Sequence, residues 1–259
     1  MSIVKYVLLT CATVLIVNAQ ETRTSIPVTT VPVKAEETLT TPVPYSIYAG
    51  VYLFGKAGMK VNVAKGSKTD VVFMGTPDFG AQIMFPFMRN GNFGFGLDIG
   101  LSSYGYVNKP ESNVTDDNKI IEQYQFINIF PHLNLSGVII GVNINNVSGG
   151  STKTNSGKDV SVDITQTTTP ADYSKSLTSF SEIRAGLAIP VMDENYGRLN
   201  ASLMLGYGLG GIFKDDGKNY VYAYDRDGLT LPSFSADNNP KPVSIAIGVS
   251  FLFKIPVIK

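Results

Sequence analysis

Residues 92–102, with the sequence NFGFGLDIGLS, restrict the possible fold more than any other stretch of this chain. Large apolar residues occupy every second position, and glycine, serine or a single carboxylate occupies most positions between them. Side chains alternate between the two faces of a β-strand, so this period predicts a strand with one apolar face and one face of small groups. Segments 199–210 and 243–253 repeat the pattern. Such strands favour a closed barrel whose narrow interior accepts only small residues.

Eight segments of this kind follow one another from residue 45 onward. Short turns follow the second, fourth and sixth segments, and long polar connections follow the first, third, fifth and seventh. We expect the long connections to carry most of the charged residues, including Lys56 and Lys60 after the first segment. An even strand number with short turns at one rim and long loops at the other is typical of a transmembrane β-barrel. The segments span about 45–56, 77–88, 92–106, 121–136, 138–147, 177–191, 199–210 and 243–253.

The polar faces of these strands indicate which side of the barrel meets water. On a solvated surface roughly 25–35% of the residues are charged. The polar faces of these strands are charged far more sparsely, because all eight together carry only about four charges. These are Asp98, Glu122, Glu182 and Arg184. We therefore expect the apolar faces to point outward into lipid, and the alternative is a soluble lipid carrier with apolar faces inward. Because buried charges are costly unless paired, the four charged residues are expected to form a salt-bridge and hydrogen-bond network that plugs the lumen.

Aromatic residues gather near both expected rims, as in the interfacial girdles of membrane barrels. At the long-loop rim they are Tyr104, Tyr106 and Tyr124. Pro131 and Pro190 fall inside strands towards the short-turn rim, where each removes a backbone donor and a β-bulge can accommodate it. At the short-turn rim the aromatic residues are Phe85, Phe87, Phe93, Phe251 and Phe253.

The N-terminal region divides into two further parts. Residues 1–19 combine Lys5, an apolar run and a small residue before Gln20, which predicts a cleaved secretory signal peptide. Residues 20–44 form a Thr/Pro-rich leader, and residues 45–259 form the barrel domain. Cys11 lies within the signal peptide, so the mature chain is expected to lack cysteine. With 21 basic and 21 acidic residues, the balance of charge gives no indication of nucleic-acid binding.

From residue 45 to residue 253, the chain resembles the small eight-stranded outer-membrane β-barrel proteins of Gram-negative bacteria. The resemblance rests on the strand count, the signal peptide, the alternating loop lengths and the aromatic-ending segment VSIAIGVSFLF. It implies insertion into the bacterial outer membrane by the barrel-assembly machinery and contact with lipid or lipopolysaccharide. It also implies long loops outside the cell and a leader in the periplasm. One departure is that KIPVIK follows Phe253, where the family usually ends.

Motifs that could carry chemistry have structural interpretations. Residues 206–211 match G-x-G-x-x-G, but they continue a strand instead of opening a helix, so we predict no dinucleotide site. His132 is the single histidine, and no convincing nucleophile accompanies it. The motifs at 215–217 and 225–228 lack the full ligand spacing of a calcium loop. We therefore predict no catalytic residue, cofactor or metal site.

The expected function is a non-enzymatic outer-membrane barrel with a structural or surface-recognition role carried by its long loops. An open, porin-like channel is disfavoured because eight strands leave little lumen. Two alternatives remain, an envelope lipid-modifying enzyme using His132 and a soluble lipocalin-like carrier. The loops are candidates for binding an extracellular ligand.

Overall fold

The structure is a computed structural model that describes residues 46–61, 67–73, 76–88, 93–157, 177–214, 222–224, 230–232 and 239–257. The predicted signal peptide and leader lie outside the described residues, as do the incomplete calcium-loop motifs at 215–217 and 225–228. Within the described ranges, no helix has the length and apolar character needed to cross a membrane.

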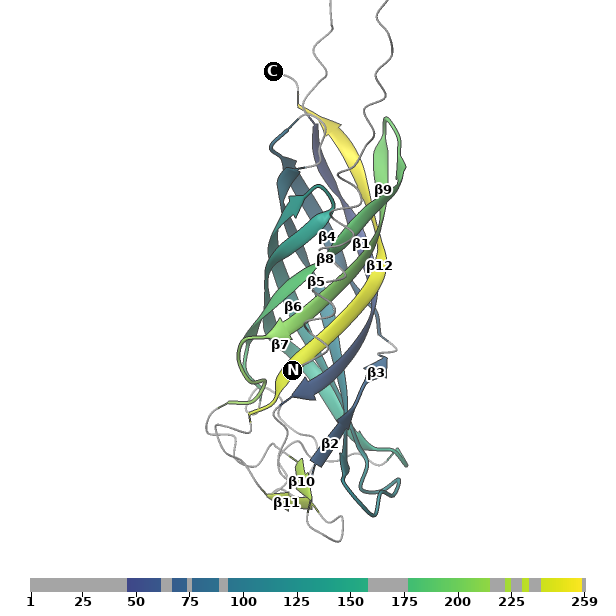
Figure 1. Ribbon diagram of the computed structural model, residues 1–259, viewed down its shortest axis with the longest axis vertical. Coiled ribbons are helices and arrows are strands. Elements are labelled where there is room, and N and C mark those ends of the chain that lie inside the picture. Colours follow the sequence, from purple (N-terminus) through teal and green to yellow (C-terminus); the bar gives the residue numbers. More distant parts are fainter. Residues whose placement is uncertain are drawn as a thin grey trace, which may run out of the picture. The chain divides into compact units, whose positions relative to one another are not determined.

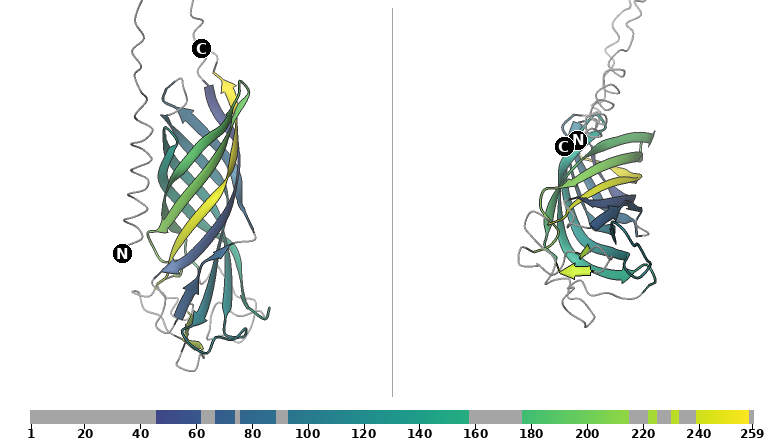
Figure 2. Two further views of the ribbon diagram at one scale, coloured as in Figure 1. Left: turned by 45° about the vertical axis from the view of Figure 1, so that its right-hand side comes forward. Right: turned by 60° about the horizontal axis from the view of Figure 1, so that its bottom comes forward.

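Eight long antiparallel strands form a closed ring (Figures 1 and 2). Each strand pairs with the next along the chain, and the last pairs with the first, from Ser46 opposite Pro256 to Val61 opposite Lys241. This is the predicted up-and-down barrel. The eight are β1 (Ser46–Val61), β4 (Asp78–Pro86), β5 (Phe93–Pro110), β6 (Ile120–Leu135), β7 (Val138–Thr154), β8 (Phe180–Asp193), β9 (Gly197–Gly208) and β12 (Lys241–Pro256).

Short strands accompany the ring. β2 (Ser67–Asp70) pairs with β5, and β3 (Val72–Phe73) pairs with β1. β10 (Tyr222–Tyr224) and β11 (Thr230–Pro232) pair only with each other in the described sheets. Thus the connections from β1 to β4 and from β9 to β12 contain secondary structure that strand alternation did not predict.

The apolar faces of the ring point outward. On β12, for example, Ile247 is 66% exposed and Phe253 is 54% exposed, whereas Ser244 and Ser250, on the opposite face of the same strand, are buried. From Ile245 to Ile255, the outward apolar residues of this strand cover about 25 Å of height at the usual strand tilt, which matches the apolar band of a membrane barrel. A water-soluble carrier would reverse this arrangement, so the soluble-barrel alternative is wrong.

The two prolines within strands are accommodated differently. At Pro190 the register of β8 and β9 shifts, which is the expected bulge. At Pro131 no bulge occurs, because β6 and β7 keep one register from Ile129 to His132. The register shift between these two strands lies instead at Gln125 and Phe126.

The predicted tyrosine girdle is wrong. Tyr104, Tyr106 and Tyr124 are fully buried inside the barrel, where their rings lie close to one another and to Phe126. The phenylalanines of the short-turn rim do face outward, with Phe87 65% exposed. One rim therefore has the expected aromatic belt, and the aromatic residues near the other rim form an internal cluster.

The C-terminal strand does not end at Phe253. β12 continues through Lys254 to Pro256, paired with the first residues of β1. Lys254 Nζ lies 2.6 Å from Asp193 Oδ1, and Arg198 Nη2 lies 2.8 Å from Asp193 Oδ2. Partial burial alone would raise the pKa of the Asp193 carboxyl, but hydrogen bonds from Lys254 and Arg198, together with their charges, lower it overall. The additional residues thus attach the last strand to the β8–β9 turn.

Candidate functional site in the barrel interior

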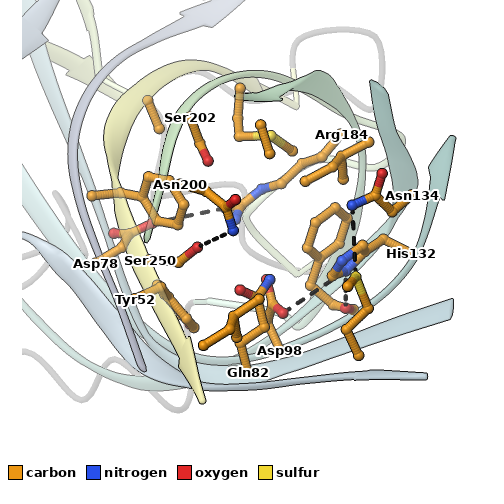
Figure 3. A pocket seen from close by; sticks show the side chains of 18 of the residues that line it. Tyr52, Asp78, Gln82, Asp98, His132, Asn134, Arg184, Asn200, Ser202 and Ser250 are labelled. Atoms are coloured by element: carbon orange, nitrogen blue, oxygen red, sulfur yellow. Dashed lines mark hydrogen bonds and ion pairs between the residues drawn. The ribbon is translucent and has the colours of Figure 1, made fainter. Parts of the chain in front are cut away.

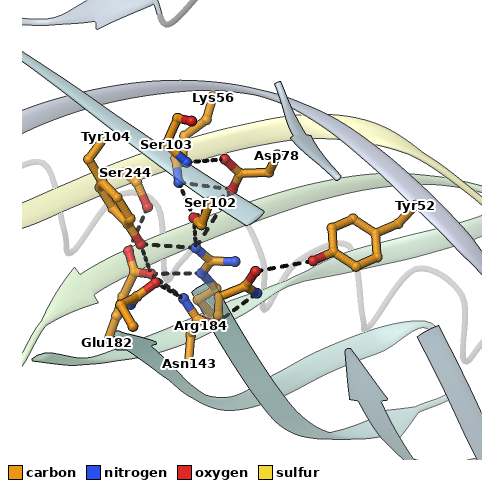
Figure 4. Close-up of polar contacts among 12 residues, drawn as sticks. Tyr52, Lys56, Asp78, Ser102, Ser103, Tyr104, Asn143, Glu182, Arg184 and Ser244 are labelled. Carbon is orange, nitrogen blue, oxygen red and sulfur yellow. Dashed lines mark hydrogen bonds and ion pairs between the residues drawn. The ribbon is translucent and has the colours of Figure 1, made fainter. Parts of the chain in front are cut away.

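The centre of the lumen holds a network around Arg184 and Glu182, two inward-facing residues of β8 (Figure 4). Arg184 Nε donates to Glu182 Oε2 at 2.7 Å, and Arg184 Nη2 donates to the Tyr104 hydroxyl at 3.0 Å. Glu182 also accepts hydrogen bonds from Tyr104 at 2.6 Å, Ser244 at 2.7 Å and Asn143 at 3.3 Å. Strands β5, β7, β8 and β12 are therefore connected through one buried carboxylate.

A second ion pair adjoins this network. Lys56 Nζ lies 2.8 Å from Asp78 Oδ2 and also donates to Ser102 Oγ at 2.6 Å. Ser102 Oγ lies 3.5 Å from Arg184 Nη2, so the two ion pairs share a hydroxyl. Lys56 is 1% exposed and its Nζ lies 3.5 Å from the centroid of the Tyr104 ring. The expectation that Lys56 belongs to a solvated loop is wrong.

The outer end of the lumen contains a third pair and a cluster of aromatic and aliphatic side chains. Lys60 forms a salt bridge with Glu122, and both side chains are almost fully buried. The expected position of Lys60 in a polar loop is therefore wrong as well. Two members of the cluster, Leu177 and Phe213, belong to the connections outside the ring. They pair with each other in an isolated antiparallel β-bridge. Its buried members are Tyr104, Tyr106, Tyr124, Phe126, Leu177, Phe180, Ile212 and Phe213.

On the short-turn side of the central network lies a cavity of about 30 Å³ (Figure 3). Asp98 on β5 and Gln82 on β4 are directly opposite each other in the strand register and line this cavity. His132 is 3% exposed, and its Nδ1 lies 3.1 Å from the Phe130 carbonyl oxygen and 3.9 Å from Asp98 Oδ1. The Tyr52 hydroxyl donates to Asn128 Oδ1 at 3.3 Å.

The structure separates the four charged residues expected to form one network. Glu182 and Arg184 are in direct contact, Glu122 pairs with Lys60, and Asp98 lies beside the cavity. The sequence interpretation missed Lys56, Lys60 and Asp78. Both lysines occupy the same face of β1 as the inward-facing Tyr48 and Tyr52, and continuing the alternation would have placed them inside.

The glycine motif at 206–211 lies partly on the inner face of β9. A Cβ at Gly206 would overlap Glu182 and Ser244, and a Cβ at Gly208 would overlap Pro242. These glycines leave space for the buried network instead of cradling a phosphate. Among the described residues, no group of three or more His, Cys, Asp or Glu side chains is arranged to hold a metal ion.

This interior is suited to holding the barrel together. Its ion pairs and hydrogen bonds cross from strand to strand, and the aromatic cluster fills the outer end of the lumen. A second small apolar group, Tyr48, Met84 and Leu252, lies towards the other end. The cavity between them has space for about one or two water molecules, so it is too small for a lipid chain.

No protein-family model matches this sequence, and no curated protein is significantly similar to it. Solved structures show a distant likeness. The outer membrane protein OprG from Pseudomonas aeruginosa has 9% identical residues and a TM-score of 0.36, and the match covers 83% of this chain and 98% of OprG. Ail, the attachment invasion locus protein of Yersinia pestis, solved with the heparin analogue sucrose octasulfate, has 11% identity and a TM-score of 0.32, with coverage of 80% and 98%.

The outer membrane protein AlkL, determined in DMPC lipid bilayers, has 12% identity and a TM-score of 0.33, with coverage of 92% of this chain and 100% of AlkL. The closed set of strand pairings establishes the fold independently of these likenesses. The chain is an eight-stranded antiparallel transmembrane β-barrel with its apolar faces outward.

Proposed function

We propose that this protein is a non-enzymatic barrel of the bacterial outer membrane that presents a polar surface outside the cell for a structural or recognition role. The observation that carries the proposal is the continuation of three barrel strands beyond the apolar band. β5, β6 and β7 extend past their last exposed apolar residues and remain paired with one another. We call this part, formed by residues 103–110, 120–125 and 149–154, the projecting sheet.

The outward face of β6 shows the change most clearly. Leu133, Ile129 and Ile127 are exposed apolar residues, and the next two outward positions are Gln125 and Gln123, which are also exposed. Lipid provides no partners for amide side chains, so the membrane boundary on this strand lies between Ile127 and Gln125. The six residues from the start of β6 to this boundary span about 20 Å of strand.

Neighbouring strands add polar and charged groups to the projecting sheet. Lys153 on β7 is exposed, and Lys109 on β5 forms a partly exposed ion pair with Asp70 on β2, with an Nζ–Oδ2 distance of 2.7 Å. The inner face of the same strands packs on the buried aromatic cluster. A rigid sheet with an exposed polar face is suited to contacting a macromolecule at the cell surface.

The interior supports a role without transport or catalysis. Its aromatic cluster and its buried ion pairs occupy the space that a pore would need. His132, the residue on which the enzyme alternative depends, is buried inside the ring and bonded to a backbone carbonyl, so a lipid outside the barrel does not reach it. These features favour a sealed anchor.

Cysteine labelling on intact cells tests the orientation of the barrel. The single natural cysteine is Cys11, in the predicted signal peptide, so Gln123→Cys would give a mature protein with one thiol. A bulky maleimide-polyethylene glycol should label Gln123→Cys on intact cells and Glu194→Cys, in the opposite turn, only after permeabilisation. Labelling in the reverse order, or recovery of the protein in the soluble periplasmic fraction, would refute the proposal.

Two further measurements address the finer role. Purified barrel in a planar bilayer should show no stepwise conductance, and sustained single-channel steps would contradict a sealed interior. Binding of nanodisc-embedded barrel to glycan and matrix-protein arrays, lost in Lys153→Glu but unchanged in Glu194→Gln, would support recognition. A barrel that binds none of these probes would favour the structural role.

A further inference from the structure

Strands β7 and β8 separate before either reaches the end of the barrel that carries the long loops. β7 pairs with β8 from Val138 to Asn145. Beyond Asn145 it continues to Thr154 and is paired, among the described strands, with β6 alone. An open pocket of about 410 Å³ lies where the two strands separate, lined by residues 146–149, residues 177–179 and Lys214. We call it the boundary pocket.

Both walls of the boundary pocket are held in place. Ser148 is the additional residue of the bulge at which β7 changes its register against β6, and such bulges are common at barrel rims and beside functional sites. On the other wall, the Thr178 backbone N–H donates to the Ile212 carbonyl oxygen at 3.0 Å. Ser179 Oγ donates to Asn146 Oδ1 at 3.2 Å, which joins the two walls. The pocket is therefore a fixed part of the folded barrel.

The boundary pocket lies at the level where the apolar band ends. Asn146 is directly opposite Ile127 on β6, and Gly149 is directly opposite Gln125. These are the two residues of β6 between which the membrane boundary lies. On the membrane side of the pocket, Ile144 of β7 is 41% exposed on the outer surface. Lipid chains that cover Ile144 therefore bring their headgroups to the level of the pocket.

The lining of the pocket is amphipathic. Val147 and Leu177 are its apolar members, and both are packed in the aromatic cluster of the lumen. Lys214 is basic, and no carboxylate occurs among the described lining residues. The remaining polar side chains carry hydroxyl and amide groups, which both donate and accept hydrogen bonds. They are Asn146, Ser148, Thr178 and Ser179.

We propose that the boundary pocket binds the phosphorylated sugar headgroup of lipopolysaccharide, with Lys214 contacting a phosphate and the polar side chains contacting sugar hydroxyls. The proposal rests on the proposed orientation of the barrel, which places the pocket in the outer leaflet. An inorganic anion would leave the apolar lining uncovered, and a hydrocarbon would leave the polar groups without partners. A lipid at the junction of its headgroup and acyl chains satisfies both. The volume is within the range of about 300–1,000 Å³ that small-molecule sites have.

Native mass spectrometry of the purified barrel tests the site. Bisphosphorylated lipid A or phosphatidylglycerol is added to the protein in detergent at increasing concentrations, and the lipid-bound fraction is measured. We expect saturable binding of lipid A that is tighter than binding of phosphatidylglycerol, which has a phosphate but no sugar. Equal affinity for the two lipids would overturn the assignment to a sugar headgroup.

Three variants locate the binding. Lys214→Gln should weaken lipid A binding about two- to fivefold, the range of a partly exposed ion pair. Gly149→Leu should weaken it about tenfold or more by filling the pocket. A Cβ at Gly149 meets only Gln125 Oε1, at 3.8 Å, so this variant should fold, which gel mobility checks. Lys153→Gln, which removes an exposed lysine further along β7, is the matched control and should bind as the wild type does. Unchanged affinity in Gly149→Leu would overturn the proposal.

Photo-cross-linking in intact cells separates this proposal from the orientation on which it rests. With p-benzoylphenylalanine in place of Ser179, we expect a cross-linked band that contains lipopolysaccharide, and with the same group in place of Asn155, at the exposed far end of β7, none. No cross-link at Ser179, with Gln123→Cys labelled on intact cells as expected, would overturn the boundary pocket alone. Cysteine labelling in the reverse order would instead overturn the orientation.

Discussion

Replacing Arg184 by alanine tests whether the central network stabilises the barrel. The change removes the 2.7 Å ion pair with Glu182 and the hydrogen bond to Tyr104 at 3.0 Å. It also removes the weaker contacts with Ser102 at 3.5 Å and with Asp78 at 3.9 Å. The carboxylate of Glu182 stays buried because the surrounding strands do not move apart.

The expected loss of unfolding free energy depends on how well the remaining partners satisfy the buried Glu182 carboxylate. Removing one partner of a buried ion pair costs roughly 3–5 kcal/mol. Glu182 keeps hydrogen bonds from Tyr104, Ser244 and Asn143, so we expect a value near the lower limit, about 3 kcal/mol. For a domain of this size, about 2–4 °C of melting temperature corresponds to 1 kcal/mol, which predicts a decrease of roughly 6–12 °C.

Gel mobility in detergent is a suitable assay, because the chain has no tryptophan to report unfolding by fluorescence. Samples are heated to a series of temperatures, and the folded and unfolded bands are compared, with far-UV circular dichroism as a second measure. The matched control is the double variant Arg184→Met with Glu182→Gln, which removes both charges and keeps similar volumes. It should recover more than half of the lost stability.

Two results would refute this reasoning. The first is an Arg184→Ala barrel that melts within about one degree of the wild type, since about 2–4 °C per kcal/mol would then leave less than 0.5 kcal/mol for the ion pair. The second is a double variant that is no more stable than Arg184→Ala. The unpaired charge on Glu182 would then not be the cause of the loss.

Three further changes have defined outcomes. Gly206→Ala should prevent folding, because its Cβ would overlap a buried carboxylate, whereas Gly210→Ala, with open space around the Cβ, should fold normally in the same gel assay. The folded-state pKa of Asp193 is lowered, so its contribution is present above its unfolded pKa of about 4 and is lost as the pH falls through the folded value. The melting difference between wild type and Asp193→Asn should therefore shrink between pH 7 and pH 3. Ile129→Arg, on the lipid-facing surface, should cost up to about 2–4 kcal/mol in a urea titration in lipid vesicles, and Gln125→Arg, beyond the apolar band, about 0–1 kcal/mol.

Strand alternation predicted the barrel because lipid imposes the same requirement at every outward position. Phe95, Ile99 and Leu101 face outward on β5 as expected, and Asp98 faces inward. The boundaries were less predictable. β5 continues to Pro110, because its pairing with β6 and β2 extends beyond the lipid-facing part, where outward side chains no longer need to be apolar.

The error at the tyrosines has a specific cause. Tyr104 and Tyr106 lie on the same face of β5 as Asp98 and Ser102, so strict alternation places them in the lumen. The prediction of an outer girdle rests instead on the frequency of tyrosines at membrane interfaces. A strand cannot turn its side chains to the other face without a change of register, and β5 keeps one register with β6 throughout this region.

The lysines show what a single sequence does not reveal. The same alternation would have placed Lys56 and Lys60 inside, but their charge favoured a solvated loop. Their partners, Asp78 and Glu122, come from other strands, and the stagger between strands in the closed barrel decides which groups meet. Glu182 and Arg184 were easier to associate, because they lie two residues apart on one face of one strand.

The position of the aromatic cluster connects the closed interior with the proposed surface role. Tyr106 and Tyr124 belong to the parts of β5 and β6 that form the projecting sheet, and they pack on its inner face. Gln123 and Gln125 lie on the opposite, exposed face of β6. A sheet outside the membrane has no lipid to support it, so the cluster that closes the lumen also holds this sheet in place. Replacing the tyrosines by small residues would therefore weaken the sheet as well as open the interior, and an engineered pore in this barrel should be obtained only with loss of order in its outer surface.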